Sequence, residues 1–486
     1  MKKFFLVWFI WLYAVSALYV KPKLALEDDF YIAPDNIDDY SEGDVIRHRP
    51  APGMIRSIYY PIEIKNAWQF LVRSTDSRGN ATAIVTTVLE PFDADPTKLL
   101  SYQFAEDSAS IDCSPSYSIL FGAKMDTVVL QAEMILLTTG LSRGWFVVAP
   151  DYEGPQGAFT AGRQAGHATL DSIRAVLNTQ NITRIDPDAK VAMWGYSGGT
   201  IASGWAAQLQ PKYAPELKDN LIGVAVGGWV TNITLTAQAT DQTIFAGLIP
   251  NCINGIILEF PYLKDTVYNS LNEDRRDWFF RAKDQCLLNS IFKYAFHNFF
   301  SGLHPYFKDG WSFFQMEEIK EIVDYNTLAL TEDQGYPEIP MFVFHSTADE
   351  VVPFPGAQRA YENYCDWGID SLEFAVSNST GHVLEVVEGS GAAIKWLSDR
   401  FEGKDPVKGC KKTVRRTNLE YPGADLSYYQ IARTLYTSFS GEIGVSYPRN
   451  TTSTEAFDDK YEWVVEQLTK IGPIPFKKRA DQYLIE

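Results

Sequence analysis

The sequence predicts an α/β protein in which helices cover both faces of a mostly parallel sheet. Short apolar runs alternate along the chain with segments whose apolar residues recur at helical spacing. Strands of a parallel sheet have such nearly continuous apolar runs, because helices bury both of their faces. The predicted strands are 83–89, 99–104, 145–150, 191–194, 221–226, 341–344 and 372–376. The predicted helices between them include 161–177, 200–209, 356–367 and 392–401.

Length and charge narrow the class of protein. The chain has 486 residues, enough for one large domain with an insertion. Its formal net charge at pH 7 is −18. A surface with this balance repels phosphates, so we expect no nucleic acid among its partners.

One long stretch breaks the alternation of strands and helices. Residues 231–336 are mostly helical in pattern and rich in aromatic side chains, as in 278–280 and 294–300. A segment of this length is far too long to be a simple loop between two core strands. We therefore expect a helical cap inserted over the functional site. The alternative is a second core domain with no functional role.

The first residues have the pattern of a secretory signal. Lys2 and Lys3 precede an apolar run, 4–15, and small residues around Ala17 permit cleavage after it. The run is too short to cross a bilayer, and no later stretch resembles a transmembrane helix. We expect residues 1–17 to be a signal peptide and the mature protein to be secreted, without an integral membrane segment.

Cysteines and glycosylation sequons fit export. Five cysteines in an oxidising compartment favour two disulfides and one free thiol. The sequence contains neither a CxxC pair nor a His-rich cluster, so we expect no metal. The N-x-S/T sequons begin at Asn80, Asn181, Asn232, Asn378 and Asn450.

Residues 195–199 form a G-x-S-x-G motif between a predicted strand and a predicted helix. Glycine at Gly195 and Gly199 lets the chain turn tightly enough to expose Ser197 in a strained conformation. This context predicts an α/β-hydrolase fold with the helical cap inserted between core strands, and Ser197 as nucleophile. The N-terminus of the following helix offers the backbone N–H of Gly198 to a developing oxyanion.

A nucleophilic serine needs a histidine base, and in this fold the order is serine, acid, histidine. His297 and His304 fall in the predicted cap, where packing roles are expected, and His345 precedes the best acid. His382 lies in a predicted loop between the last strand and the last helix. It is therefore the candidate base.

The acid should follow the strand before the last one. Asp349 lies on a loop directly after predicted strand 341–344 and is the candidate. Glu350 is the nearest competitor, and Asp366 and Asp370 lie too close to the following helix. A second oxyanion donor should come from the loop after strand 99–104, among residues 105–108, although spacing alone selects none of them.

These motifs together resemble the fungal secretory lipase family. The similarity extends over 39–444 and includes segments 101–103, 113–117, 151–154, 213–217, 349–353 and 396–401 around the serine motif. The resemblance implies a Ser197–Asp349–His382 triad and an oxyanion hole made by the backbone N–H groups of Asp107 and Gly198. It also implies disulfides Cys113–Cys286 and Cys365–Cys410, with Cys252 free. Ser346 departs from the glycine that is common at its position.

The expected organisation follows from these segments. It comprises a signal peptide (1–17), an irregular lead-in (18–50), the first part of the core (51–230), the cap (231–336), the second part of the core (337–412) and a C-terminal flap and extension (413–486). The expected function is that of a secreted triacylglycerol lipase, a serine ester hydrolase that works without a cofactor through an acyl-enzyme at an oil–water interface, as a monomer. A short-chain carboxylesterase or an acyltransferase with the same triad is the alternative, and a catalytically inert surface-binding protein is a third hypothesis.

Overall fold

The computed structural model describes residues 21–59, 62–425 and 427. The expected signal peptide, Asn450 and most of the expected C-terminal extension lie outside these residues. A ten-stranded sheet runs through the molecule in the order β1-β2-β3-β5-β4-β6-β7-β8-β9-β10. Its strands are β1 (Val45–Pro50), β2 (Asn66–Thr75), β3 (Ala81–Glu90), β4 (Asp95–Gln103), β5 (Trp145–Pro150), β6 (Lys190–Tyr196), β7 (Leu221–Gly227), β8 (Met341–Ser346), β9 (Ser371–Ser377) and β10 (Gly409–Arg415).

The sheet is parallel from β5 through β4 to β10, and β1, β2 and β3 add an antiparallel edge. Strand β5 is buried over its whole length, as its apolar sequence predicts. The expected alternation of strands and helices is therefore confirmed in its main elements.

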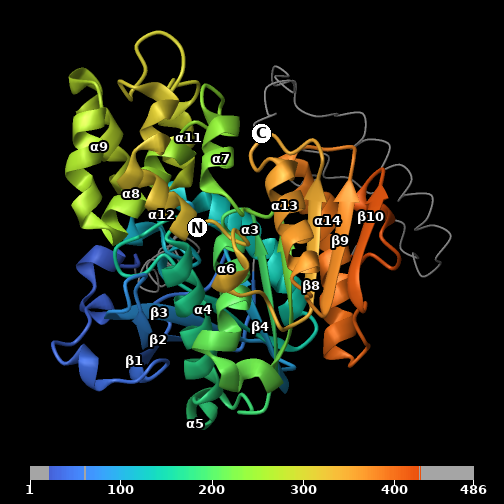
Figure 1. Cartoon of the computed structure of the whole chain (residues 1–486). Coiled ribbons are helices and arrows are strands. Elements are labelled where there is room, and N and C mark those ends of the chain that lie inside the picture. The colour runs from blue at the N-terminus through green and yellow to red at the C-terminus, as the bar shows by residue number, and fades with distance from the viewer. Residues whose placement is uncertain (1–20, 60–61, 426, 428–486) are drawn as a thin grey trace, which may run out of the picture.

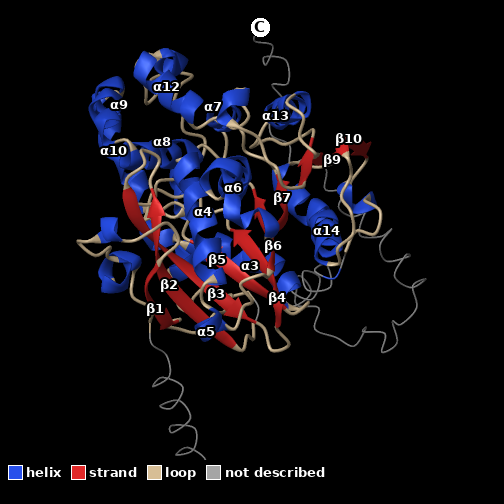
Figure 2. Cartoon of the chain, turned by 60° about the horizontal axis from the view of Figure 1, so that its bottom comes forward, coloured by secondary structure: helices blue, strands red, loops and turns tan. Residues whose placement is uncertain are grey.

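Helices cover both faces of the sheet (Figures 1 and 2). On one face, α4, α6 and α13 pack with apolar side chains such as Ile173, Ala206 and Tyr364. On the other face, α3 and α14 contribute Leu137 and Trp396 to a second cluster. Within the described residues, the α-helices outside the segment between β7 and β8 are α2 (Pro115–Ser118), α3 (Val128–Leu141), α4 (Gly162–Leu177), α5 (Gln180–Thr183), α6 (Gly199–Tyr213), α13 (Phe354–Asp366) and α14 (His382–Phe401).

The segment 231–336, between β7 and β8, folds into helices that gather at one end of the sheet (Figure 1). We call this segment the insertion. It contains α7 (Ile233–Thr240), α8 (Leu248–Glu259), α9 (Lys264–Ser270), α10 (Arg276–Phe280), α11 (Leu287–Tyr294) and α12 (Glu317–Tyr325). It has a hydrophobic cluster of its own, rich in aromatic side chains such as Phe279, Phe299 and Phe307.

Three local predictions were wrong or incomplete. The expected irregular lead-in ends in a strand, β1, which pairs with β2; its Arg and His side chains conceal the apolar alternation that marks a strand. Strand β10 was missed because its exposed edge position leaves it rich in charged residues. Helix α14 begins at His382, so this residue opens a helix and does not lie in a loop. Among the described helices, none is both long and apolar enough to cross a membrane.

Candidate active site

Ser197 lies at a sharp turn between β6 and α6. Its φ of 51° is in the left-handed region, which is uncommon for a residue with a side chain. A Cβ atom at Gly195 would lie 2.6 Å from the Gly199 carbonyl oxygen, and a Cβ at Gly199 would lie 2.1 Å from the Gln103 carbonyl oxygen. Neither position can carry a side chain, which explains both glycines of the motif in physical terms.

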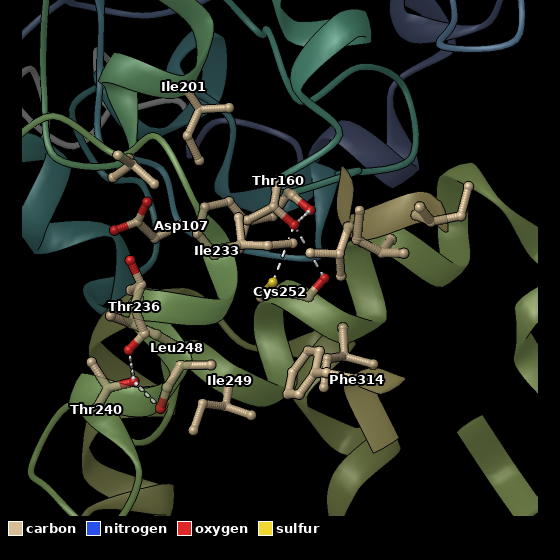
Figure 3. Close-up of a pocket in the computed structure, with 18 of the residues that line it drawn as sticks. Asp107, Thr160, Ile201, Ile233, Thr236, Thr240, Leu248, Ile249, Cys252 and Phe314 are labelled. Atoms are coloured by element: carbon tan, nitrogen blue, oxygen red, sulfur yellow. Dashed lines mark hydrogen bonds between the residues drawn. The ribbon is translucent and has the colours of Figure 1, made fainter. Parts of the chain in front are cut away.

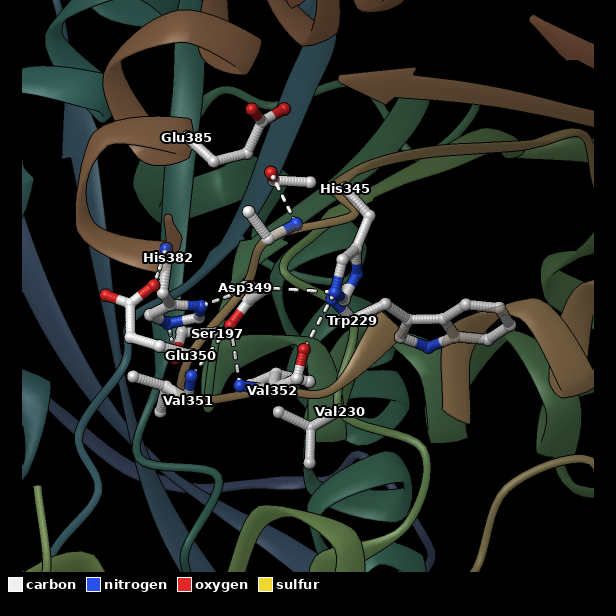
Figure 4. A network of polar contacts seen from close by, with 12 residues as sticks. Ser197, Trp229, Val230, His345, Asp349, Glu350, Val351, Val352, His382 and Glu385 are labelled. Atoms are coloured by element: carbon white, nitrogen blue, oxygen red, sulfur yellow. Dashed lines mark hydrogen bonds and ion pairs between the residues drawn. The ribbon is translucent and has the colours of Figure 1, made fainter. Parts of the chain in front are cut away.

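Three residues that are distant in the sequence form a hydrogen-bonded chain at this turn (Figure 4). His382 Nε2 lies 2.7 Å from Ser197 Oγ, and His382 Nδ1 lies 2.7 Å from Asp349 Oδ2. The other carboxylate oxygen of Asp349 accepts the backbone N–H groups of Val351 and Val352 at 3.0 and 2.6 Å. The serine, histidine and acid selected from the sequence therefore meet at one point.

The competing residues lie elsewhere or have other partners. His297 contacts the Tyr306 hydroxyl within the insertion at 2.9 Å, and exposed His304 contacts Asp274. Glu350 accepts the backbone N–H of His382 at 2.7 Å and so binds the first turn of α14, not the imidazole ring.

Burial and nearby charges shift the pKa values of His382 and Asp349 in opposite directions. Burial alone lowers the pKa of His382, but Asp349, Glu350 and Asp107 nearby outweigh it and raise this pKa above its ordinary value. Burial alone raises the pKa of Asp349, but His382 and the hydrogen bonds to its carboxylate hold this pKa below its ordinary value. A neutral imidazole beside an ionised carboxylate can take a proton from a serine hydroxyl.

The loop that follows β4 is held by hydrogen bonds at three of its residues. The N–H of Ala105 donates to the Glu133 carboxylate at 3.0 Å. The carbonyl of Asp107 accepts from Asn251 of α8 at 2.7 Å, and the Ser108 hydroxyl donates to the Gln285 carbonyl at 2.8 Å. Two of these three contacts come from the insertion, which therefore helps to hold the loop.

Asp107 covers the start of α6. A Cβ atom at Gly198 would lie 1.6 Å from Asp107 Oδ1, so only glycine fits under this carboxyl group. Asp107 has a φ of 50°, and no hydrogen bond within the described part of the chain engages its backbone N–H or that of Gly198. Burial raises the pKa of the Asp107 carboxyl to about 7, although His382 opposes this shift.

An apolar pocket opens from Ser197 into the insertion. It is lined on the sheet side by Asp107, Ser197 and Ile201, and Figure 3 shows Asp107 and Ile201 facing the side chains of the insertion. Its remaining wall comes mainly from α7, α8, α9 and α12, with side chains such as Ile249 and Val267. A pocket with apolar walls and few polar groups suits apolar ligands.

Both expected disulfides are present. Cys113–Cys286 links the segment after β4 to the insertion, and Cys365–Cys410 links α13 to β10. Cys252 is free; burial raises the pKa of its thiol to about 11, and its sulfur lies 3.2 Å from the Thr160 hydroxyl at the pocket.

Four of the five sequons lie within the described residues. Asn80, Asn181 and Asn378 are exposed, and Asn232 is half-buried at the N-cap of α7, where its side-chain oxygen accepts two backbone N–H groups. In the described residues, no group of three or more His, Cys, Asp or Glu side chains is arranged to hold a metal ion.

Sequence reasoning missed three parts of the site. Asn251 binds the loop after β4, Glu350 binds the start of α14, and His345 lies against Asp349. His345 lies near the end of a strand, four residues before the candidate acid, and this position could have indicated its contact with Asp349. No sequence signal indicated the role of Asn251, because its partner is distant in the sequence.

Comparison with known proteins identifies the family. The family model described as Secretory lipase matches residues 119–409. Lipase 1 of Candida albicans is 48% identical over 439 residues, which are 90% of this chain and 94% of that protein. Lipase A of Arthroderma benhamiae is 38% identical over 82% of this chain and 84% of that protein.

Solved structures agree with the sequence relatives. Candida antarctica lipase A superposes with a TM-score of 0.77 at 28% identity, over 87% of this chain and 97% of that one. The rice cell wall degrading esterase LipA from Xanthomonas oryzae, at 15% identity and a TM-score of 0.59, shares the fold, over 75% of this chain and all of that one. These matches confirm the predicted α/β-hydrolase fold, and the family model and the relatives together show that this chain belongs to the secretory lipase family.

Proposed function

We propose that this protein is a secreted triacylglycerol lipase in which Ser197, His382 and Asp349 form the catalytic triad. The observation that carries the proposal is the chain of two 2.7 Å contacts from Ser197 Oγ through the imidazole to Asp349, at the mouth of an apolar pocket. Nucleophile, base and orienting acid in contact are the requirement for acyl transfer from an ester.

The reaction proceeds in two steps. His382 Nε2 accepts the Ser197 proton as the hydroxyl oxygen attacks the ester carbonyl, and the imidazolium then gives this proton to the leaving alcohol. A water molecule, deprotonated by the same nitrogen, then attacks the acyl carbonyl. The bond to Ser197 Oγ breaks as the imidazolium returns the proton to this oxygen, and the fatty acid leaves. Asp349 keeps Nδ1 protonated, so Nε2 is the free base in each step.

The backbone N–H groups of Asp107 and Gly198 form the oxyanion hole in this proposal. Both flank Ser197, both lack an acceptor in the described part of the chain, and the ties of residues 105–108 fix the loop before substrate arrives. Donors held in place in this way stabilise a developing charge without reorganisation.

The insertion serves as a cap that binds the acyl chain. Its helices supply most of the pocket wall, and this apolar wall extends from Ser197 to side chains of α9 and α12, a length of apolar surface that favours long acyl chains over short ones. This observation favours a lipase over a short-chain carboxylesterase with the same triad. Residues 1–17 act as the signal peptide, and the exposed sequons at Asn80, Asn181 and Asn378 are the proposed glycan sites together with Asn232 and Asn450.

The test measures hydrolysis against acyl chain length, on glycerides below and above their solubility limit. We expect high activity on long-chain emulsions and its loss in Ser197→Ala, which should also stop labelling by a fluorophosphonate. Ser203→Ala, in the same helix α6, is the control and should keep the labelling. Activity confined to short soluble esters would leave a carboxylesterase, and activity that survives Ser197→Ala would exclude the proposed nucleophile.

A further inference from the structure

A second histidine contacts the carboxylate of Asp349. His345, the penultimate residue of β8, is fully buried, and its Nε2 lies 3.4 Å from Asp349 Oδ2, the oxygen that also faces His382. The same nitrogen lies 2.9 Å from the Val352 carbonyl oxygen. The acid loop is therefore held from the strand side by an imidazole that the proposed two-step reaction does not use (Figure 4).

The partners of His345 fix its proton. The backbone N–H of Trp229 donates to Nδ1 at 3.0 Å, so Nδ1 carries no proton. The Val352 carbonyl can only accept, so Nε2 carries the proton. Burial lowers the pKa of His345 below its ordinary value, against the opposing effect of Asp349. His345 is thus a neutral imidazole with one tautomer, and it leaves the charge of Asp349 available to His382.

The three contacts of His345 join two walls of the site. Val352 and Val351 donate their N–H groups to the other oxygen of Asp349, and His345 binds the carbonyl of the same Val352. Trp229 follows Gly228, where a Cβ atom would lie 2.8 Å from Cε1 of His382. One imidazole therefore connects the turn that presents Asp349 to the segment that packs against the ring of His382.

We propose that His345 is a positioning residue for ester hydrolysis, whose Nε2–H holds the acid turn so that Asp349 Oδ2 meets His382 Nδ1. This inference rests on the proposed triad. In this inference, the N–H donor at Nε2 aligns Asp349. The acceptor at Nδ1 fixes the tautomer of His345 and holds residues 228–229 in place. A misalignment of about 1 Å in such a chain costs on the order of 10²-fold in rate.

Two substitutions separate the two nitrogens. His345→Asn places an amide oxygen near the position of Nδ1 and keeps an acceptor for Trp229, but its side chain does not reach Val352. His345→Gln places an amide nitrogen near the position of Nε2 and keeps the donor, but loses the acceptor. His167→Gln is the control, because this half-buried histidine also contacts a backbone carbonyl, that of Thr75, and stacks on Tyr213 away from the site.

The experiment measures kcat and KM for a soluble short-chain p-nitrophenyl ester across pH, in wild type and the three variants. For His345→Asn we expect kcat to fall about 10²-fold with KM little changed, since the substrate pocket is untouched. His345→Gln should keep the larger part of kcat. His167→Gln should lower only the melting temperature.

The acid limb of the kcat/KM profile provides a readout that a packing role would not move. His382 must be neutral to act, and Asp349, Glu350 and Asp107 raise its pKa. When Asp349 turns away in His345→Asn, this pKa falls and the acid limb moves to lower pH. Glu350, Asp107 and the helix neighbour Glu385 are unchanged in all variants. In His345→Asn, proton NMR should show a weaker downfield signal from the His382 Nδ1–H, because the contact of this group with Asp349 is lost.

The proposal requires that His345→Asn and His345→Gln differ in their loss of kcat. Equal loss of kcat in His345→Asn and His345→Gln with an unmoved acid limb would overturn it. If His345→Asn does not fold, His345→Gln alone decides. A folded His345→Gln enzyme whose kcat falls 10²-fold would overturn the proposal as well. A folded His345→Gln enzyme that keeps the wild-type acid limb would support it. Failure of the proposed function is a separate result: wild-type activity would then survive Ser197→Ala.

Discussion

The sheet and the insertion bury different kinds of side chain. Around the sheet, fully buried positions include ionisable groups such as Glu106, His345 and Glu385. The core of the insertion consists of aromatic and aliphatic side chains, with Phe300 and Phe307 stacked at 4.7 Å between ring centroids. The two regions meet at the pocket, whose sheet side holds Ser197 and Asp107 and whose other side is apolar.

This difference indicates that the sheet side and the insertion have different tasks. Buried ionisable groups must be paired at fixed distances, because an unpaired charge away from water is costly, and such pairing suits acid–base chemistry. Apolar side chains impose no such geometry on a partner, so a wall built from them accepts chains that vary in length and position. Changes on the sheet side should therefore act on rate and pH dependence, and changes in the insertion should act on substrate choice.

The largest effect is expected for the triad acid on the sheet side. Asp349→Asn keeps the shape of the side chain, but the amide no longer orients and stabilises the imidazolium of His382. We expect kcat to fall by about 10⁴-fold, the loss that follows such a change in other serine triads. Hydrolysis of a soluble ester by the purified variant measures it. Asp366→Asn, at an exposed acid that ends α13, is the control and should leave kcat unchanged. A near-normal rate for Asp349→Asn would remove Asp349 from the triad.

A second prediction concerns the buried charges themselves. Glu385, in the first turn of α14, accepts from Ser377 and from Asn418, both at 2.5 Å, and burial raises the pKa of its carboxyl to about 8. Between the ordinary value for a glutamate and about 8, the folded protein therefore binds more protons than the unfolded chain. Its stability should fall as pH rises through this window.

Glu385→Gln removes this titration and can keep both hydrogen bonds. From pH 5 to pH 8 we expect the free energy of unfolding of the wild type to fall by on the order of 1–4 kcal/mol more than that of the variant. Denaturant unfolding at the two pH values measures the difference. Glu402→Gln, at the exposed C-cap of the same helix, should behave like the wild type. Parallel pH profiles for wild type and Glu385→Gln would show that Glu385 is already ionised at pH 5.

The chemistry of the sheet side was predictable because local geometry forces its residue types. A turn as tight as the one at Ser197 demands glycine on both sides, and the order of strands limits the acid and the base to few positions. Helix α4 and the buried strands were also predictable. A helix buried on one face has apolar residues at helical spacing, and a strand buried on both faces has a nearly continuous apolar run.

Several hydrogen bonds and strand pairings between distant segments were not predictable from local pattern. Nothing in residues 105–108 selects Asp107, because its carbonyl is held by Asn251, far along the chain. Strand β10 carries mostly exposed, charged side chains and so has no apolar period. His345 was set aside because it precedes the acid in the chain. That order excludes it as the base, but not as a neighbour of Asp349 in space.

The smallest effect is expected in the insertion. Val267 of α9 is buried and lines the pocket, so Val267→Phe should fill space that a long acyl chain occupies and leave the triad untouched. Because each buried methylene contributes about 0.8 kcal/mol, excluding two of them lowers kcat/KM for long chains by about tenfold. Butyrate esters should be hydrolysed at the wild-type rate. Tyr268→Phe, at the exposed neighbouring position, is the control and should keep the wild-type ratio of long-chain to short-chain activity. If Val267→Phe lowered both activities equally, the insertion would act on the chemistry as well as on substrate choice, and the division of tasks between the two regions would fail.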